Sequence, residues 1–409
     1  MTIDRRTVLK AAAAAPAVGA LPWIGTARAQ AGNTIKIGVL NDQSGLYRDI
    51  TGPTSVACVR QAVQDFGSRG FNVEVVSADH QNKPDVGSNV ARQWFDRDGV
   101  DMIVDVPNSA VALAVSGVTR EKNRVCLNTS AATADLTGPQ CSPNTVHWTF
   151  DTWMLANSTG GAMVKAGGDT WFFLTADYAF GHALERDTAN FVRQAGGQVL
   201  GSVRTPFPGT TDFSSFIVQA QNSGADVIGL ANAGDDLSNS IKQAGDFGVA
   251  SKQRIAALIA NVNNIQGLGL PASQGLQVVT GYYWDLNEGT RAFAKRFQER
   301  HPRKNMPNDM QAGVYASVLH YLKAVEQAKS ADDGRVVVAA MKTIPTDDPL
   351  FGKGTIRADG RKMHPMHLFT TKTPQESKGP WDFYNLVRSI PADEAFRPLA
   401  EGGCPLASQ

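Results

Sequence analysis

Small polar and aromatic residues recur in short segments, each of which directly follows an apolar run of the sequence. The segments are Asn108-Ser109, 128–133 (NTSAAT), 177–181 (DYAFG), 232–235 (NAGD) and 261–263 (NVN). If the apolar runs are parallel strands, these segments lie at their carboxyl ends, where helix N-termini offer backbone N–H groups. Hydroxyls, amides and N–H groups there would suit a carboxylate or an uncharged polar ligand edge. Helix capping alone explains Ser109 or Asp235 singly, but explains the whole set less well.

Residue patterns that indicate catalysis are missing from the sequence. It contains no G-x-S-x-G nucleophile elbow, no H-E-x-x-H zinc helix and no complete G-x-x-x-x-G-K-[ST] phosphate loop. His364 and His367 have no third metal ligand nearby, and the cysteine spacings fit no zinc template. We therefore expect a binding protein rather than an enzyme, with no catalytic residue, metal or cofactor.

The elements that would position these segments form two successive series of strands and helices. The strands expected in the first series are 35–40, 73–76, 102–106, 125–127 and 146–150, and those in the second are 171–175, 198–203, 227–230, 254–259 and 277–282. Strands that alternate with helices indicate mostly parallel sheets with both faces covered. Because the element order repeats, the sequence predicts an α/β fold with two lobes, followed by long helices after Tyr283 and a tail from Leu350 that could cross between lobes.

Composition excludes several other classes of protein. The 409 residues include 39 Lys+Arg and 38 Asp+Glu, and 42% are hydrophobic. The near-neutral charge balance does not indicate the excess of basic residues that binds nucleic acid. The hydrophobic content is that of a folded globular protein.

The first 29 residues are typical of an export signal. Arg5 and Arg6 precede an apolar run at 11–24, and Ala27 and Ala29 form an A-x-A cleavage site. The paired arginines resemble a bacterial twin-arginine signal. The run is too short to span a bilayer as a mature helix, and no later stretch is long and apolar enough. We expect cleavage near Ala29 and a periplasmic mature chain that is not inserted in the membrane.

Four cysteines occur in the chain, and an oxidising compartment would make disulfides plausible among them. Two bridges allow three pairings, and the sequence does not choose among them. The four are Cys58, Cys126, Cys141 and Cys404.

Four stretches resemble the branched-chain amino-acid-binding (Leu/Ile/Val-binding-like, type I) family of periplasmic solute-binding proteins, which serve ABC importers. They are 35–47 (IKIGVLNDQSGLY), 128–137 (NTSAATADLT), 176–181 (ADYAFG) and 212–230 (DFSSFIVQAQNSGADVIGL). The resemblance implies two Rossmann-like lobes, joined by three crossings of the chain, that close on a ligand. Crossings near Phe150, Tyr282 and Leu350 would give lobe 1 as 33–151 plus 283–349 and lobe 2 as 152–282 plus 350–409. The implied partners are a membrane permease and an ATPase, with the binding protein itself a monomer.

The resemblance also implies a set of ligand-binding residues. Hydroxyls and backbone N–H groups of Ser109, Ser130, Ala131 and Thr133 would hold a carboxylate. The remaining expected contacts are Tyr47 on the floor of the site, Tyr178 or Phe180 closing from the second lobe, and Asn232, Asp235, Asn261 and Tyr282.

Departures from the family pattern bear on the ligand. Amino-acid binders of the family place an acidic residue after the strand that here ends near Ile259, to pair with the ligand ammonium. This chain has 260–263 (ANVN) there, with no carboxylate, and an unpaired buried ammonium would be costly. A run at 379–391 (GPWDFYNLVRSIP) also resembles members tied to aromatic acids. We therefore expect a small carboxylate ligand, with an aromatic acid as the leading candidate. The alternatives are a branched-chain or other hydrophobic amino acid, with Asp235 as ammonium partner, or a periplasmic sensor subunit or enzyme on the same scaffold.

Overall fold

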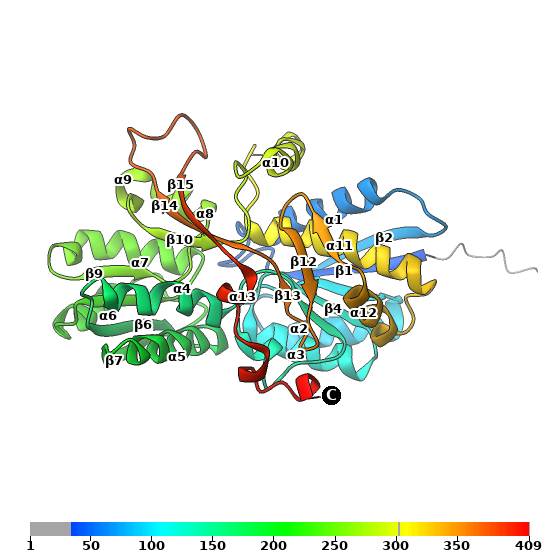
Figure 1. Cartoon of the computed structure of the whole chain (residues 1–409), viewed down its shortest axis with the longest axis horizontal. Coiled ribbons are helices and arrows are strands. Elements are labelled where there is room, and N and C mark those ends of the chain that lie inside the picture. Colours follow the sequence, from blue (N-terminus) through cyan, green and yellow to red (C-terminus); the bar gives the residue numbers. More distant parts are fainter. Residues whose placement is uncertain (1–33, 302, 409) are drawn as a thin grey trace, which may run out of the picture.

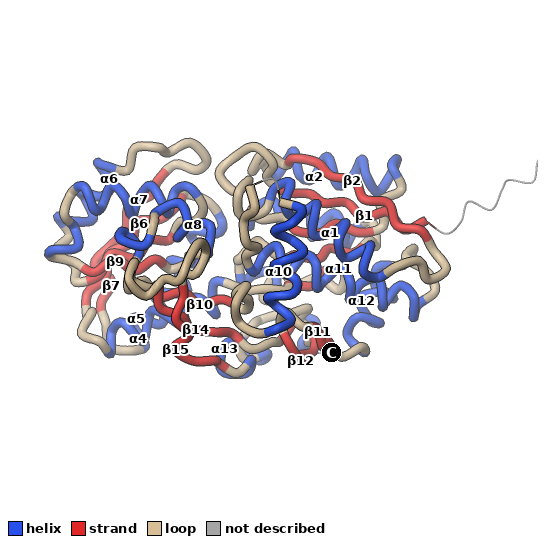
Figure 2. Tube along the Cα trace, turned by 90° about the horizontal axis from the view of Figure 1, so that it is seen from above, coloured by secondary structure: helices blue, strands red, loops and turns tan. Residues whose placement is uncertain are grey.

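The chain folds into two lobes that lie side by side, as both views of the computed structural model show (Figures 1 and 2). The structure describes residues 34–301 and 303–408. Each lobe contains a parallel sheet flanked by helices, so the predicted α/β fold is confirmed. The expected signal peptide, residues 1–29, lies outside the described residues.

Lobe 1 is built on a five-stranded parallel sheet of order β2-β1-β3-β4-β5. Every residue of β3, β4 and β5 is buried, as expected for parallel strands covered on both faces. The strands are β1 (Thr34–Asn41), β2 (Asn72–Asp79), β3 (Met102–Asp105), β4 (Val125–Asn128) and β5 (Thr145–His147). The helices and helical turns of lobe 1 are α1 (Gly52–Phe66), α2 (Pro84–Gln93), η1 (Trp94–Asp98), α3 (Ser109–Glu121), η2 (Ala134–Thr137), α10 (Glu288–Arg300), α11 (Asp309–Ala328) and α12 (Gly334–Thr343).

Lobe 2 contains a four-stranded parallel sheet of order β7-β6-β8-β9. Its strands are β6 (Thr170–Ala176), β7 (Gln198–Thr205), β8 (Val227–Ala231) and β9 (Arg254–Ala257). Its helices and turns are α4 (Thr152–Lys165), α5 (Ala179–Gln194), α6 (Ser214–Asn222), α7 (Asp235–Asp246), η3 (Val249–Ser251), α8 (Val262–Leu268) and α9 (Leu270–Ser273). The segment expected to continue the parallel series is β10 (Gln277–Thr280), which instead pairs antiparallel with β14 (Met366–Thr371). β14 in turn pairs antiparallel with β15 (Tyr384–Ile390).

The third crossing between the lobes lies later in the chain than expected. β11 (Thr346–Asp348), β12 (Gly352–Ile356) and β13 (Lys362–Met363) form a small antiparallel sheet. Leu350, Phe351 and Ile356 are buried in the same core as the strands of lobe 1. Burial of these apolar side chains holds the segment on lobe 1, so the chain crosses between β13 and β14 rather than at Leu350.

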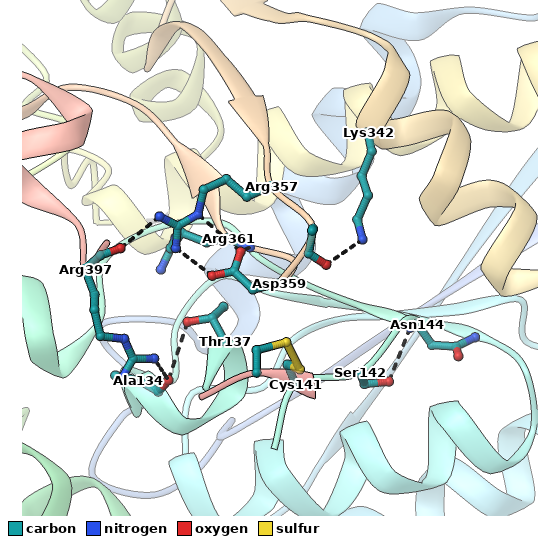
Figure 3. The surroundings of a disulfide bond; sticks show 12 residues. Ala134, Thr137, Cys141, Ser142, Asn144, Lys342, Arg357, Asp359, Arg361 and Arg397 are labelled. Carbon is teal, nitrogen blue, oxygen red and sulfur yellow. Dashed lines mark hydrogen bonds and ion pairs between the residues drawn. A yellow bond between two sulfur atoms is a disulfide. The ribbon is translucent and has the colours of Figure 1, made fainter. Parts of the chain in front are cut away.

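The C-terminal tail makes a further crossing and returns to lobe 1. After α13 (Ala392–Ala395), Arg397 Nη2 donates to the carbonyl of Ala134 at 3.1 Å, and Cys404 forms a disulfide with Cys141 (Figure 3). The short turns η4 (Leu399–Glu401) and η5 (Pro405–Ser408) end the described chain. Residues from about 397 therefore belong with lobe 1, which corrects the expectation that the whole tail packs on lobe 2. Cys58 and Cys126 are buried free thiols.

Arg361 links three of the crossings through a buried ion pair and a contact with an aromatic ring. Arg361 Nη1 lies 3.2 Å from Asp151 Oδ2, and Arg361 also donates to the carbonyl of Thr149. Asp151 Oδ1 accepts from the Met154 N–H at 2.8 Å and so caps α4. The Arg361 guanidinium lies 4.6 Å from the centre of the Phe396 ring in the tail. Burial lowers the pKa of Arg361 to about 10. The first, third and last crossings are thus fixed to one another.

Candidate functional site

A cavity lies where the carboxyl ends of the two parallel sheets face each other, the place where open α/β sheets bind ligands. Its walls come from loops that follow β1, β3 and β4 in lobe 1 and β6, β8 and β9 in lobe 2. No ionisable acid or base other than tyrosine is among its lining residues, which are Tyr47, Ile50, Pro107, Ser130, Ala132, Phe150, Tyr178, Phe180, Ala233, Ile259, Asn261, Asn264 and Met310.

The two lobes are closed on this cavity. Its volume is about 20 Å³, enough for about one water molecule. Asn263 of lobe 2 donates to the carbonyl of Asp49 of lobe 1 at 3.1 Å, and Arg48 lies 3.8 Å from Asp235 across the rim. Because opposing walls belong to different lobes, a larger ligand enters only when the lobes move apart.

Two tyrosines meet across the cavity. The hydroxyls of Tyr47 of lobe 1 and Tyr178 of lobe 2 are hydrogen-bonded to each other. Phe207 stacks on Tyr178 with ring centres 4.0 Å apart and on Tyr47 with centres 5.7 Å apart. Burial is the main cause that raises the pKa of both hydroxyls. Tyr47, Tyr178 and Phe180 were all expected at the site. Phe207 was not predicted, because no polar segment directly follows the strand before it.

Ser109 and Thr133 are two neighbouring buried residues of lobe 1, each with a side-chain hydroxyl. The backbone N–H of Thr133 donates to Ser109 Oγ at 3.2 Å, and Thr133 Oγ1 accepts from the Asp135 N–H at 3.3 Å. Both side chains are fully buried, and within the described residues neither hydroxyl donates a hydrogen bond. Each therefore keeps a proton with which to bind an acceptor. The structure brings this expected pair together, but neither residue is among those that line the cavity.

The backbone of Ala131 is already engaged. Its N–H donates to Asn128 Oδ1 at 3.2 Å and its carbonyl accepts from Asn128 Nδ2 at 2.8 Å. The structure thus places Ala131 beside the cavity but with its N–H directed to a side chain of the same loop.

Ser130 lines the cavity, but its proton points away from it. The Ser130 hydroxyl donates to Asp105, which also accepts from Asn41 Nδ2 at 2.9 Å and Thr129 Oγ1 at 3.3 Å. Asp105 has a positive φ of 88°, an unusual conformation for a residue with a side chain. Burial raises the pKa of Asp105, and these hydrogen bonds oppose that rise. Because its proton is used on Asp105, Ser130 offers the cavity an acceptor. Asp105 is the last residue of β3 (MIVD). An acidic residue at the end of an otherwise apolar strand is the one signal that could have identified it.

The other expected residues of lobe 2 take different places. Asn261 lines the cavity while its side chain caps α8, accepting from the Asn263 N–H at 3.0 Å. Asn232 is buried below the wall and donates to Ser240 Oγ at 2.8 Å. Asp235 lies at the rim, paired with Arg48. Tyr282 lies outside the cavity, in the lobe 1 core against Phe293 and Phe351.

Two of the larger grooves each lie on a single lobe. One, of about 350 Å³, lies between α1 and the end of α10, and the other, of about 360 Å³, lies between α4, β9 and β10. Neither is lined by both lobes, so a lobe motion cannot enclose a ligand in them.

Two parallel-sheet lobes that close on a cavity at facing strand ends define a two-lobed ligand-binding protein. A model of the periplasmic binding protein family matches residues 34–379. The chain belongs to this family, as its sequence motifs predicted, and the family implies an exported, periplasmic location. Among the described residues, none of the helices has the length and apolar content needed to cross a membrane.

Solved structures support the same assignment. A periplasmic binding protein from Burkholderia mallei is 47% identical with a TM-score of 0.89, over 91% of this chain and 99% of that chain. A branched chain amino acid ABC transporter periplasmic ligand-binding protein from Burkholderia xenovorans LB400 is 38% identical with a TM-score of 0.79, over 91% of this chain and all of that chain. A solute binding protein of an ABC transporter from R. palustris, in complex with benzoate, shares the fold at 21% identity and a TM-score of 0.79, over 91% of this chain and 100% of that chain.

Proposed function

We propose that the chain is the substrate-binding component of an ABC importer and captures a small aromatic carboxylic acid by closure of its lobes. The observation that carries the proposal is the cavity wall, where aromatic and aliphatic side chains surround a space without a charged residue. Such a wall suits a flat apolar ring. The solved relative with bound benzoate supports the choice of ligand class.

The carboxylate of this ligand would bind to lobe 1. Ser109 and Thr133 present two hydroxyl protons at the start of α3 and η2, in the loops after β3 and β4. Hydrogen bonds from neutral donors and a helix N-terminus stabilise an anion without a buried arginine. The ring would then lie between Tyr47 and Tyr178 as the lobes close.

A thermal-shift panel tests the ligand class. We expect benzoate and related aromatic acids to stabilise the protein, because a ligand at 100 times its Kd adds about 2.7 kcal/mol to the free energy of unfolding. Ser109→Ala combined with Thr133→Val removes both donors and should weaken binding at least about tenfold. The control is Thr137→Val, which alters a buried threonine that donates to Ala134 on the far side of the same turn. Stabilisation by leucine or valine alone would contradict the proposal.

A hydrophobic amino acid is the second candidate, supported by the branched-chain relative from B. xenovorans. Its ammonium would need a carboxylate partner, and Asp235 was the expected one. Asp235 lies at the exposed rim and is already paired with Arg48, which favours the aromatic acid. Recovery of unmodified ligand after long incubation would separate either binding function from an enzyme on this scaffold, and co-purification with a permease would separate transport from sensing.

A further inference from the structure

The turn η2 connects the cavity wall of lobe 1 to lobe 2. It directly follows the loop 128–133, in which Ala132 lines the cavity. Within the turn, Asp135 Oδ1 lies 3.2 Å from Arg186 Nη2, which belongs to α5 of lobe 2. A shift of this turn would therefore disturb both the loop that lines the cavity and a contact between the closed lobes.

The C-terminal tail packs on this turn with no room for a side chain between them. A Cβ at Gly138 would lie 2.9 Å from the carbonyl oxygen of Gly402, and a Cβ at Gly402 would lie 3.2 Å from the carbonyl oxygen of Thr137. Arg397 Nη2, which donates to the Ala134 carbonyl, also lies 2.9 Å from the Cβ position of Gly138. Figure 3 shows the Arg397 guanidinium directed at Ala134 and the disulfide beyond Thr137. The backbone of the tail thus holds the backbone of the turn.

The start of the tail is held on lobe 2. Ala395 and Phe396 are buried in the hydrophobic cluster that includes residues of β6 and β8. Asn157 Nδ2 of α4 donates to the Glu394 carbonyl at 2.9 Å. Because Phe396 packs on lobe 2 and the next residue, Arg397, bonds to lobe 1, this crossing contains no flexible linker.

Beyond Phe396, little apolar surface holds the tail in place. Among residues 397–407 only Gly402 and Cys404 are buried. Neither has a large apolar side chain, so the hydrophobic effect anchors this segment weakly. The disulfide between Cys141 and Cys404 is therefore its principal anchor on lobe 1. Without that cross-link the segment gains the freedom to leave the turn.

We infer that residues 397–404, the C-terminal strap, hold η2 and the loop before it in the geometry that binds ligand, and that the disulfide between Cys141 and Cys404 is a positioning element for that loop. Neither cysteine is among the residues that line the cavity, so both act through the turn. The effect on affinity rests on the proposed function, because it assumes a ligand between the lobes. The order of the turn does not depend on the ligand and is measured without one.

Hydrogen exchange of the ligand-free, full mature chain tests the strap directly. In the double variant Cys141→Ser, Cys404→Ser we expect the backbone amides of 128–141 to exchange about fivefold faster than in the wild type, or more. Calorimetric titration with benzoate, well below the unfolding temperature, should give a Kd about tenfold weaker, the effect of losing one hydrogen bond to a charged ligand. Arg397→Met keeps the disulfide and should produce part of both changes, which covers the case in which the double variant does not fold.

Phe66→Ala is the matched control, because Phe66 is the last residue of α1, in the core of the same lobe and on the side away from the tail (Figure 1). It should lower the unfolding temperature but leave the exchange of 128–141 and the Kd close to the wild-type values. If the double variant behaves like Phe66→Ala, the disulfide only stabilises the fold and the inference is overturned. If the wild type does not bind benzoate, the proposed ligand class fails, and the exchange rates still decide whether the strap orders the turn.

Discussion

Two buried aspartates at the site differ in how they are satisfied. Asp105 accepts hydrogen bonds from the side chains of Asn41, Thr129 and Ser130. Asp236 accepts none from the described residues. These three donors hold the Asp105 carboxylate and their own side chains in place, so Asp105 serves to orient the loops after β1 and β4. A carboxylate with no donor is destabilising until a ligand or a proton reaches it.

The unpaired state of Asp236 predicts a pH-dependent effect on stability. Burial, followed by the nearby Asp235, raises the pKa of Asp236 to about 7, whereas an aspartate in an unfolded chain titrates near about 3.9. Between these values the folded protein holds a proton that the unfolded chain has released. The penalty to the folded state therefore grows as pH rises through this window and is complete above about pH 7.

Asp236→Asn should remove that penalty. We expect it to raise the free energy of unfolding, and the gain at pH 8 should exceed the gain at pH 5 by about 2–3 kcal/mol. Urea unfolding at the two pH values measures the difference. Asp235→Asn, at the half-exposed rim, should change stability little at either pH. Equal effects of Asp236→Asn at both pH values would show that the carboxylate is already satisfied in the folded protein.

Among the elements, the crossings are held by the buried pair of Arg361 and Asp151. Their side chains are 1% and 3% exposed, so removal of one charge leaves the other buried without a partner. We expect Arg361→Met to lower the free energy of unfolding by about 3–5 kcal/mol. The double variant Arg361→Met, Asp151→Asn should recover part of this loss, because Asn still caps α4 and no charge remains unpaired.

The control for this pair lies in the same tail. Arg388 and Glu394 form an ion pair at 2.8 Å with side chains 53% and 52% exposed. Arg388→Met should cost less than about 1 kcal/mol, since water screens the exposed pair. Urea unfolding of the three variants beside the wild type gives the comparison. A similar small loss for Arg361→Met would mean that the crossings do not depend on the ion pair.

Elements that follow a strong local pattern were predicted well from the sequence. The loops at Ser109, Ser130 and Tyr178 end strands of parallel sheets, and parallel strands place all such ends on one edge. The segment 350–363 was assigned to the wrong lobe because its strands β12 and β13 pair with each other and with β11, and only an isolated bridge between Arg361 and His147 links it to the lobe 1 sheet. Its place depends on Leu350, Phe351 and Ile356 packing on helices far away in the sequence. No local sequence pattern predicts that contact.

The sequence could have shown that Asp236, and not Asp235, is the buried aspartate of α7. Asp236, Ser240 and Ala244 recur every fourth residue beside Leu237 and Ile241, and all five are buried on one face of α7. The spacing therefore placed Asp236 on the buried face and Asp235 off it. The disulfide between Cys141 and Cys404, by contrast, joins residues 263 positions apart, and only the path of the tail back to lobe 1 determines it.

At the scale of the whole molecule, the proposed function requires the lobes to move apart from the closed form so that a ligand can enter. The closed form is stabilised by a small set of polar contacts across the cavity, among them the hydroxyls of Tyr47 and Tyr178 and the bond from Asn263 to Asp49. The crossings themselves stay fixed to one another by Arg361. We therefore expect opening to separate the cavity walls while the hinge side of the molecule stays intact.

Tyr47→Phe removes one hydrogen bond of the closed form and keeps the ring that stacks near Phe207. Loss of about 1 kcal/mol would shift the ratio of closed to open molecules about fivefold toward open. We expect a larger radius of gyration for the ligand-free variant in X-ray scattering, a faster ligand dissociation rate, and compaction to the wild-type value at saturating ligand. Tyr315→Phe is the control. It also removes a tyrosine hydroxyl, but that hydroxyl donates to Asp65 within lobe 1, at 2.6 Å. If both variants scatter like the wild type, the tyrosine pair does not hold the lobes together, and closure must rest on the contacts at the rim.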